Sequence, residues 1–234
     1  MNGYVVWAWR AGLNLLCGAV LADALSGCSN DEASYFRRMG ELTLTLVSGA
    51  EKAAQPQRTR AELNRIPYAT IAVSSIDGPR AYLVPLADNG GYLDYRDEAG
   101  NSVRVRGGAV AGLQTAGNDL DGVLYDQNDP IAHPRPSALW PQHVWRQYQF
   151  SVINEGSRVI SLSCVFQPAG PETIEIVELN YSVTRVKEVC TNARRQVINT
   201  YWIDDKTGFI WKSEQWLGPR IGAVVVEVIR PYAG

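Results

Sequence analysis

The cysteines carry the most specific chemistry in this sequence, beginning with Cys28. It follows Leu25-Ser26-Gly27, which places a branched residue at position −3 and small residues at −2 and −1. Signal peptidase II needs small side chains beside the bond that it cuts, and the cysteine thiol carries the diacylglycerol. We therefore predict that Cys28 is lipidated and becomes the first mature residue. Cys17 is a poorer site, because Leu16 is too large for position −1.

The residues before Cys28 have the composition of a targeting segment. Arg10 is the only cation among them, and the apolar stretch at 11–25 is interrupted by polar residues. This stretch is too short for a spanning helix, which needs about 20 apolar residues. We predict a signal peptide at 1–27 and a lipidated tether at 28–32, with acyl chains such as palmitate as the anchor. Ser29, in place of an aspartate, favours the outer membrane, with the protein facing the periplasm.

Cys164 and Cys190 remain in the mature chain. An oxidising periplasm permits a disulfide between them, provided that their strands are neighbours and their Cβ atoms face each other. Two separate buried thiols are the alternative. His133 and His143 are the only histidines, and they show no ligand spacing with the cysteines. The sequence therefore predicts neither a metal site nor a cofactor.

Acidic residues gather between 118 and 130 without forming a recognisable catalytic motif. Asp119 and Asp121, with Asp126 and Asp129 beyond them, resemble part of a calcium loop, but Val123 interrupts the series of oxygen ligands. No Gly-x-Ser-x-Gly motif supplies a nucleophile. We predict no catalytic residues. A glycan-modifying or hydrolytic enzyme that uses these acids stays open as the alternative.

Four aromatic residues are candidates for contact with a glycan or a partner protein: Trp140, Trp145, Tyr148 and Trp211. Aromatic faces stack on sugar rings, and they can line a saccharide groove. The same side chains can fill the core of a small barrel, because each buries a large apolar area. Core filling is the favoured interpretation of these aromatic residues.

Short segments with strand periodicity fill the chain from residue 68 onward, separated by turn sequences such as Asp77-Gly78-Pro79. We predict strands at 68–74, 80–86, 91–96, 103–106, 145–154, 158–167, 173–179, 181–191, 196–203, 209–216 and 223–229. Hairpin-length links between them predict a mainly β fold. An antiparallel meander would curl into a barrel-like domain or stack as a sandwich. We expect one mostly β periplasmic domain over 33–234.

Other segments should not form strands. Residues 33–54 are predicted to contain a short N-terminal helix, and Thr59 to Glu62 has the spacing of a capping box. Residues 118–141 are predicted to be a long loop.

The composition excludes some classes of protein. The chain has 234 residues, 46% of them hydrophobic, and a formal net charge of −2. Without clustered lysine and arginine, nucleic acid is not expected as a partner. The hydrophobic content is also too high for a disordered protein.

Several segments together resemble the YjbF/GfcB family of exopolysaccharide and group 4 capsule lipoproteins. They are the Leu25–Cys28 motif, Ile66-Pro67-Tyr68-Ala69-Thr70-Ile71, the stretch 108–120, and Tyr201-Trp202-Ile203-Asp204-Asp205-Lys206-Thr207-Gly208 running into Trp211-Lys212-Ser213. The resemblance implies a mostly β, barrel-like sheet. It also implies an association with machinery that secretes surface polysaccharide, including a periplasmic partner and an outer-membrane β-barrel. It supplies no catalytic residues.

These observations together predict a non-enzymatic outer-membrane lipoprotein that assists assembly or export of an exopolysaccharide or capsule. Its expected partners are the lipid bilayer that holds its anchor and polysaccharide-export proteins, with the glycan itself as a further candidate. A lipoprotein that binds only other proteins is a further possibility, and it would show a broad exposed apolar patch.

Overall fold

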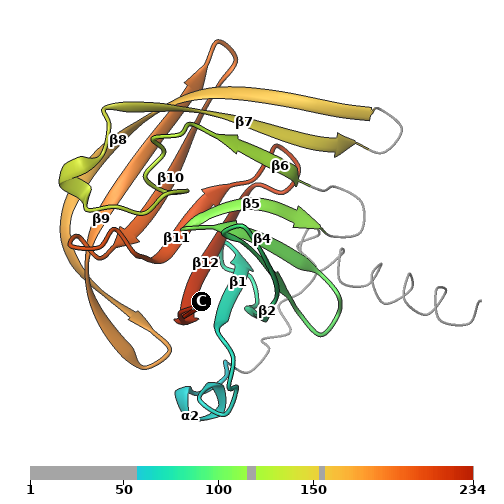
Figure 1. Cartoon of the computed structure of the whole chain (residues 1–234), viewed down its shortest axis with the longest axis vertical. Helices are drawn as coiled ribbons and strands as arrows, with labels where there is room; N and C mark the ends of the chain where they lie inside the picture. The colour runs from blue at the N-terminus through green and yellow to red at the C-terminus, as the bar shows by residue number, and fades with distance from the viewer. Residues whose placement is uncertain (1–56, 115–119, 153–155, 234) are drawn as a thin grey trace, which may run out of the picture. The chain divides into compact units, whose positions relative to one another are not determined.

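The computed structural model describes residues 57–114, 120–152 and 156–233 (Figure 1). The chain divides into two units after Arg38, and all of these residues belong to the second. The predicted signal peptide, Cys28 and the helix expected at 33–54 lie outside the described residues. Within the described ranges, no helix is long and apolar enough to cross a membrane.

The described residues form a closed antiparallel barrel. Its strands are β1 (Thr70–Ser75), β2 (Ala81–Asn89), β3 (Tyr92–Arg96), β4 (Ser102–Arg106), β5 (Ala109–Gln114), β6 (Leu120–Tyr125), β7 (His143–Val152), β8 (Gly156–Ile176), β9 (Leu179–Asn192), β10 (Arg195–Ile203), β11 (Ile210–Trp216) and β12 (Ala223–Arg230). Each strand pairs with the next along the chain, and β1 pairs with β12 to close the barrel. The predicted meander is confirmed, and it forms a barrel rather than a sandwich.

The structure corrects three predicted segments. The strands predicted at 158–167 and 173–179 are one strand, β8, because a β-bulge between Pro168 and Gly170 lets the pairing with β9 continue. Strand β5 was not predicted. Strand β6 occupies the first part of the predicted 118–141 loop. The prediction was wrong there because Asp121-Gly122, a pair typical of turns, lies within the strand.

The barrel interior is filled by alternate residues of the strands. In β12, Val224 and Val226 point into the main hydrophobic core. Glu227, which directly follows Val226, points outward and pairs with Arg80. The connection from β6 to β7, which contains the 3-10 helix η2 (Ser137–Leu139), also enters the interior. Its Ile131 and Ala132 are buried in a second core cluster. The loop therefore packs inside the barrel instead of lying over it.

A third cluster lies on the outside of the barrel. Beyond the bulge, residues 170–185 of β8 and β9 form a hairpin extension, which we call the distal hairpin. Its Ile174, Ile176 and Val183 pack against Ala72 of β1. Because the bulge changes which residues of β8 face inward, these apolar side chains cover the outer wall.

A short helix, α2 (Arg60–Leu63), fastens the tip of the distal hairpin. Thr59 caps it, and Thr59 and Glu62 form the predicted capping box. The Arg60 guanidinium donates to the backbone carbonyls of Ile176 at 2.7 Å, Val177 at 2.9 Å and Ile229 at 3.0 Å. Arg60 thus links the hairpin tip to β12.

Glu178→Gly should raise the free energy of unfolding by about 0.5–1 kcal/mol, because Glu178 lies at a turn position with φ of 65°. Both central residues of this two-residue turn, Val177 and Glu178, are left-handed, as in a type I′ turn. Glycine adopts that backbone without steric cost. Urea denaturation followed by circular dichroism measures the change. The matched control is Gly156→Ala at the β7–β8 turn, where φ is 79° and the sign should reverse. A less stable Glu178→Gly variant would contradict the account.

Candidate functional site

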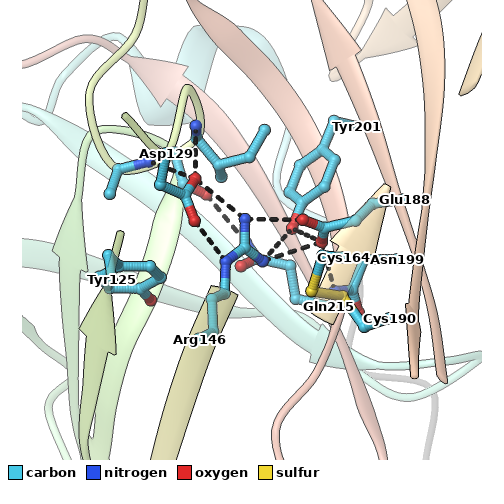
Figure 2. Close-up of polar contacts among 12 residues, drawn as sticks. Tyr125, Asp129, Arg146, Cys164, Glu188, Cys190, Asn199, Tyr201 and Gln215 are labelled. Carbon is cyan, nitrogen blue, oxygen red and sulfur yellow. Dashed lines mark hydrogen bonds and ion pairs between the residues drawn. A yellow bond between two sulfur atoms is a disulfide. The ribbon is translucent and has the colours of Figure 1, made fainter. Parts of the chain in front are cut away.

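A buried cluster of charged residues lies inside the barrel, centred on Arg146 of β7 (Figure 2). The side chains of Arg146, Asp129 and Glu188 are at most 1% exposed. Arg146 Nε and Nη2 donate to the two carboxylate oxygens of Asp129 at 2.6 and 3.0 Å. Arg146 Nη1 and Nη2 lie 2.8 Å from the two oxygens of Glu188. The guanidinium therefore joins two carboxylates that approach from different sides.

Asp129 connects this cluster to the β6–β7 loop. One of its carboxylate oxygens accepts from the backbone N–H groups of Ile131 at 2.9 Å and Ala132 at 3.4 Å. The same carboxylate is bound by Arg146. The position of the loop inside the barrel therefore depends on this ion pair.

Glu188 of β9 connects the cluster to the neighbouring strand β10. Its Oε2 accepts from Asn199 Nδ2 at 2.7 Å and from the Tyr201 hydroxyl at 2.9 Å, both from β10. Burial raises the pKa of the Glu188 carboxyl, and the positive charge of Arg146 opposes that rise. Burial and the Glu188 charge raise the pKa of Tyr201 well above its usual value, so its hydroxyl stays protonated and donates. These groups are linked through Arg146 and Glu188, which makes the cluster a brace between the loop and strands β7, β9 and β10.

Neither Arg146 nor Glu188 was predicted from the sequence to be a site residue. The spacing of their neighbours could have identified them. Arg146 lies two residues from both Val144 and Tyr148, and Glu188 lies two residues from both Val186 and Cys190, which is the period of side chains on one face of a strand. Each charged residue thus occupies an inward position of its strand. Asp129 gave no such signal, because it belongs to a loop.

The structure joins Cys164 of β8 to Cys190 of β9 in a disulfide, so the predicted pairing is confirmed. The two residues lie directly opposite each other in the register, and both are fully buried. Glu188 has a carboxylate oxygen near the two sulfur atoms. This trio cannot act as a thiolate metal site while the disulfide is intact, because both sulfur atoms are used in the bond.

The four predicted aromatic contact residues do not form one site. Tyr148 is 3% exposed and packs against Trp216 in the main core, so it is a core residue rather than a surface contact. Trp140 is half-buried at the end of the β6–β7 loop, and its Nε1 donates to a loop carbonyl. Trp145 is exposed on the outer face of β7. Trp211 is half-buried beside Tyr181 of the distal hairpin.

The acids considered for catalysis are also separated. Asp119 lies outside the described residues. Asp121 lies on the outer face, where it accepts from the Ser151 hydroxyl at 2.8 Å. It borders a groove whose other polar side chains are Asp94, Ser102, Arg104 and Gln114. Asp126 accepts from a backbone N–H of its own loop, and Asp129 is inside the barrel. The described acids of 118–130 therefore have different surroundings and share no single site.

A family model, a curated protein and a solved structure resemble this chain. The family model described as "Group 4 capsule polysaccharide lipoprotein gfcB, YjbF" matches residues 38–229. The uncharacterized lipoprotein GfcB of Escherichia coli (strain K12) is 23% identical over 224 residues, covering 91% of this chain and 96% of that protein. The crystal structure of the hypothetical lipoprotein YmcC from Escherichia coli (K12) shares the fold. Its TM-score is 0.65 and its identity 23%, over 76% of this chain and 92% of that chain.

Proposed function

The chain belongs to the YjbF/GfcB family of group 4 capsule polysaccharide lipoproteins, and on this basis we propose that it assists assembly or export of a surface polysaccharide. In this proposal it is an outer-membrane lipoprotein that faces the periplasm and is not an enzyme. Cys28 carries the lipid that holds the barrel at the membrane.

The observation that carries the proposal is the extent of the family match, which covers residues 38–229 and so includes nearly the whole barrel. The Leu25–Cys28 motif stands before the matched region, as expected of a lipoprotein. The curated relative is itself a lipoprotein by name, and this supports lipid anchoring.

The described interior supports a binding role better than a catalytic one. Arg146, Asp129 and Glu188 are fully buried and bond to one another, which leaves none of them to meet a substrate. A barrel braced in this way is a rigid support, and the function would lie in the groups on its surface. We propose that this surface contacts the glycan or the export proteins, among them an outer-membrane β-barrel.

Replacing the lipidated cysteine tests the proposal directly. In a strain that makes the polysaccharide and lacks this gene, Cys28→Ala should restore little surface polysaccharide, because the barrel is no longer held at the membrane. Surface polysaccharide is measured together with acyl labelling and membrane fractionation. The matched control is Cys17→Ala, which should restore both polysaccharide and labelling. Normal polysaccharide in the deletion strain would overturn the proposed function, and unchanged labelling of Cys28→Ala would overturn the lipidation site.

A further inference from the structure

One row of side chains crosses the outer face of the barrel at the level of the distal hairpin. The strand register places six residues directly opposite one another in succession, from β2 to β9: Tyr82, Ala72, Glu227, Lys212, Trp202 and Arg185. Directly opposed residues share a face of the sheet. Because Val226, next to Glu227, points into the core, this row points outward. We call these six residues the outer row.

The outer row contains buried polar atoms that lack hydrogen-bond partners. These are the Tyr82 hydroxyl, Trp202 Nε1, Arg185 Nε and Glu227 Oε1. Across the described ranges only one other side-chain atom is in this condition, Glu188 Oε1, which lies 2.8 Å from Arg146. A buried polar group without a partner costs free energy. Glu227 Oε1 and Arg185 Nε each have an oppositely charged neighbour, whereas the Tyr82 hydroxyl and Trp202 Nε1 have no partner of either kind. Two such donors in one row indicate groups that are kept for a ligand.

Charged neighbours make the outer row rich in donors. Glu227 forms ion pairs with Arg80 at 2.9 Å and with Lys212 at 3.2 Å. Arg185 Nε is 3.5 Å from a Glu172 carboxylate oxygen, which is an ion pair without hydrogen-bond geometry. The three cations exceed the two carboxylates by one charge. A ligand that supplies acceptor oxygens would therefore fit the row better than one that supplies donors.

Aromatic rings lie among these donors. The ammonium of Lys212 is 5.3 Å from the centroid of the Trp202 ring. The rings of Trp211 and Tyr181 are 4.1 Å apart in the same outer cluster that contains Tyr82 and Trp202. Flat apolar faces beside a few directed polar groups are typical of small-molecule sites, and sugar rings match both features.

We propose that the outer row binds a saccharide segment, with carboxylated sugars preferred over neutral ones. The Trp202 ring stacks on a sugar ring, and the Tyr82 hydroxyl, Trp202 Nε1 and Arg185 Nε donate to its oxygens. The inference rests on the proposed function for the class of ligand, and it deepens that function by naming the site that holds the polysaccharide.

The distal hairpin controls access to this site. Tyr82 and Trp202 are only partly exposed, and both pack against the cluster that contains Ile174, Ile176 and Val183 of the hairpin. The saccharide reaches the covered donors when the hairpin moves outward. Binding should therefore change amide hydrogen exchange in the distal hairpin, residues 170–185, more than in β3 and β4, which lie elsewhere in the barrel wall.

Two conservative substitutions test the site. Tyr82→Phe and Trp202→Phe should each weaken saccharide binding roughly threefold to tenfold, because each removes one donor. Tyr82→Phe should leave the melting temperature nearly unchanged, since the lost hydroxyl has no partner in the free protein. Trp202→Phe should lower it modestly, because it also removes part of a ring that packs against the outer cluster. The matched control is Tyr125→Phe, whose hydroxyl donates to the Val110 carbonyl at 2.8 Å. That variant should lose stability and keep its affinity.

Binding is measured by titration calorimetry on the purified full chain in detergent. The probes are oligosaccharides hydrolysed from the strain's own surface polysaccharide, hexagalacturonate and maltohexaose. The proposal is supported by binding of the strain's oligosaccharides or hexagalacturonate that exceeds binding of maltohexaose and is weakened in Tyr82→Phe and Trp202→Phe. It is overturned if none of the probes binds, if maltohexaose binds best, or if both variants bind as the parent does. Any of these results leaves the Cys28→Ala test of the proposed function standing, so the two failures are distinguishable.

Discussion

Arg146→Met should lower the free energy of unfolding by about 3–5 kcal/mol, the usual cost of removing one partner from a buried ion pair. Methionine retains much of the volume and none of the charge. Asp129 and Glu188, both fully buried, would then lose the guanidinium that binds their oxygens. The loop should also loosen, because Asp129 holds the backbone at Ile131.

The measurement is urea denaturation followed by circular dichroism, with Arg104→Met as the control. Arg104 pairs with Asp94 at 2.7 Å, but its side chain is 46% exposed, and its loss should cost less than about 1 kcal/mol. Adding Glu188→Gln to Arg146→Met should recover part of the loss, since it removes one unpaired carboxylate. Equal losses for Arg146→Met and Arg104→Met would show that the buried cluster does not brace the barrel.

The alternation of apolar and polar residues in the sequence predicts most of the strands and the inward position of Arg146. It does not predict that Asp129 and Glu188 are the partners of Arg146. Alternation within β7 is a property of neighbouring residues, so it can be recognised in a single sequence. Asp129, Arg146 and Glu188 meet only because the barrel closes and the β6–β7 loop enters it. Those contacts depend on tertiary packing, and the spacing of residues within one strand does not predict them.

The long strand β8 and the outer row show the same limit. Pro168 and Gly170 are usual strand-breaking residues, and only the paired strand β9 shows that they form a bulge instead. The outer row needs the register of five strand pairs at once, and a slip of one residue in any pair would reverse its face. The aromatic residues of this row therefore could not be distinguished from core residues by sequence alone.

The double variant Cys164→Ala, Cys190→Ala should lower the free energy of unfolding by about 3 kcal/mol, because the disulfide closes a loop between residues 26 apart and so restricts the unfolded chain. The barrel should still form, since β8 and β9 remain paired from Ser163 opposite Thr191 to Ile176 opposite Leu179. Urea denaturation of the variant and the parent, without reductant, measures the difference.

Reductant separates the effect of the cross-link from that of the smaller alanine side chains. Unfolding the parent in dithiothreitol should lower its stability by a similar amount, since the unfolded chain is then reduced while no side chain is lost. The native parent should resist the same reductant, because both cysteines are 0% exposed. A much larger loss in the alanine variant than in the reduced parent would assign the difference to packing beside Glu188, where the two sulfur atoms meet the buried cluster. Equal losses would assign it to the cross-link, and the ion pairs of Arg146 would then be independent of the disulfide beside them.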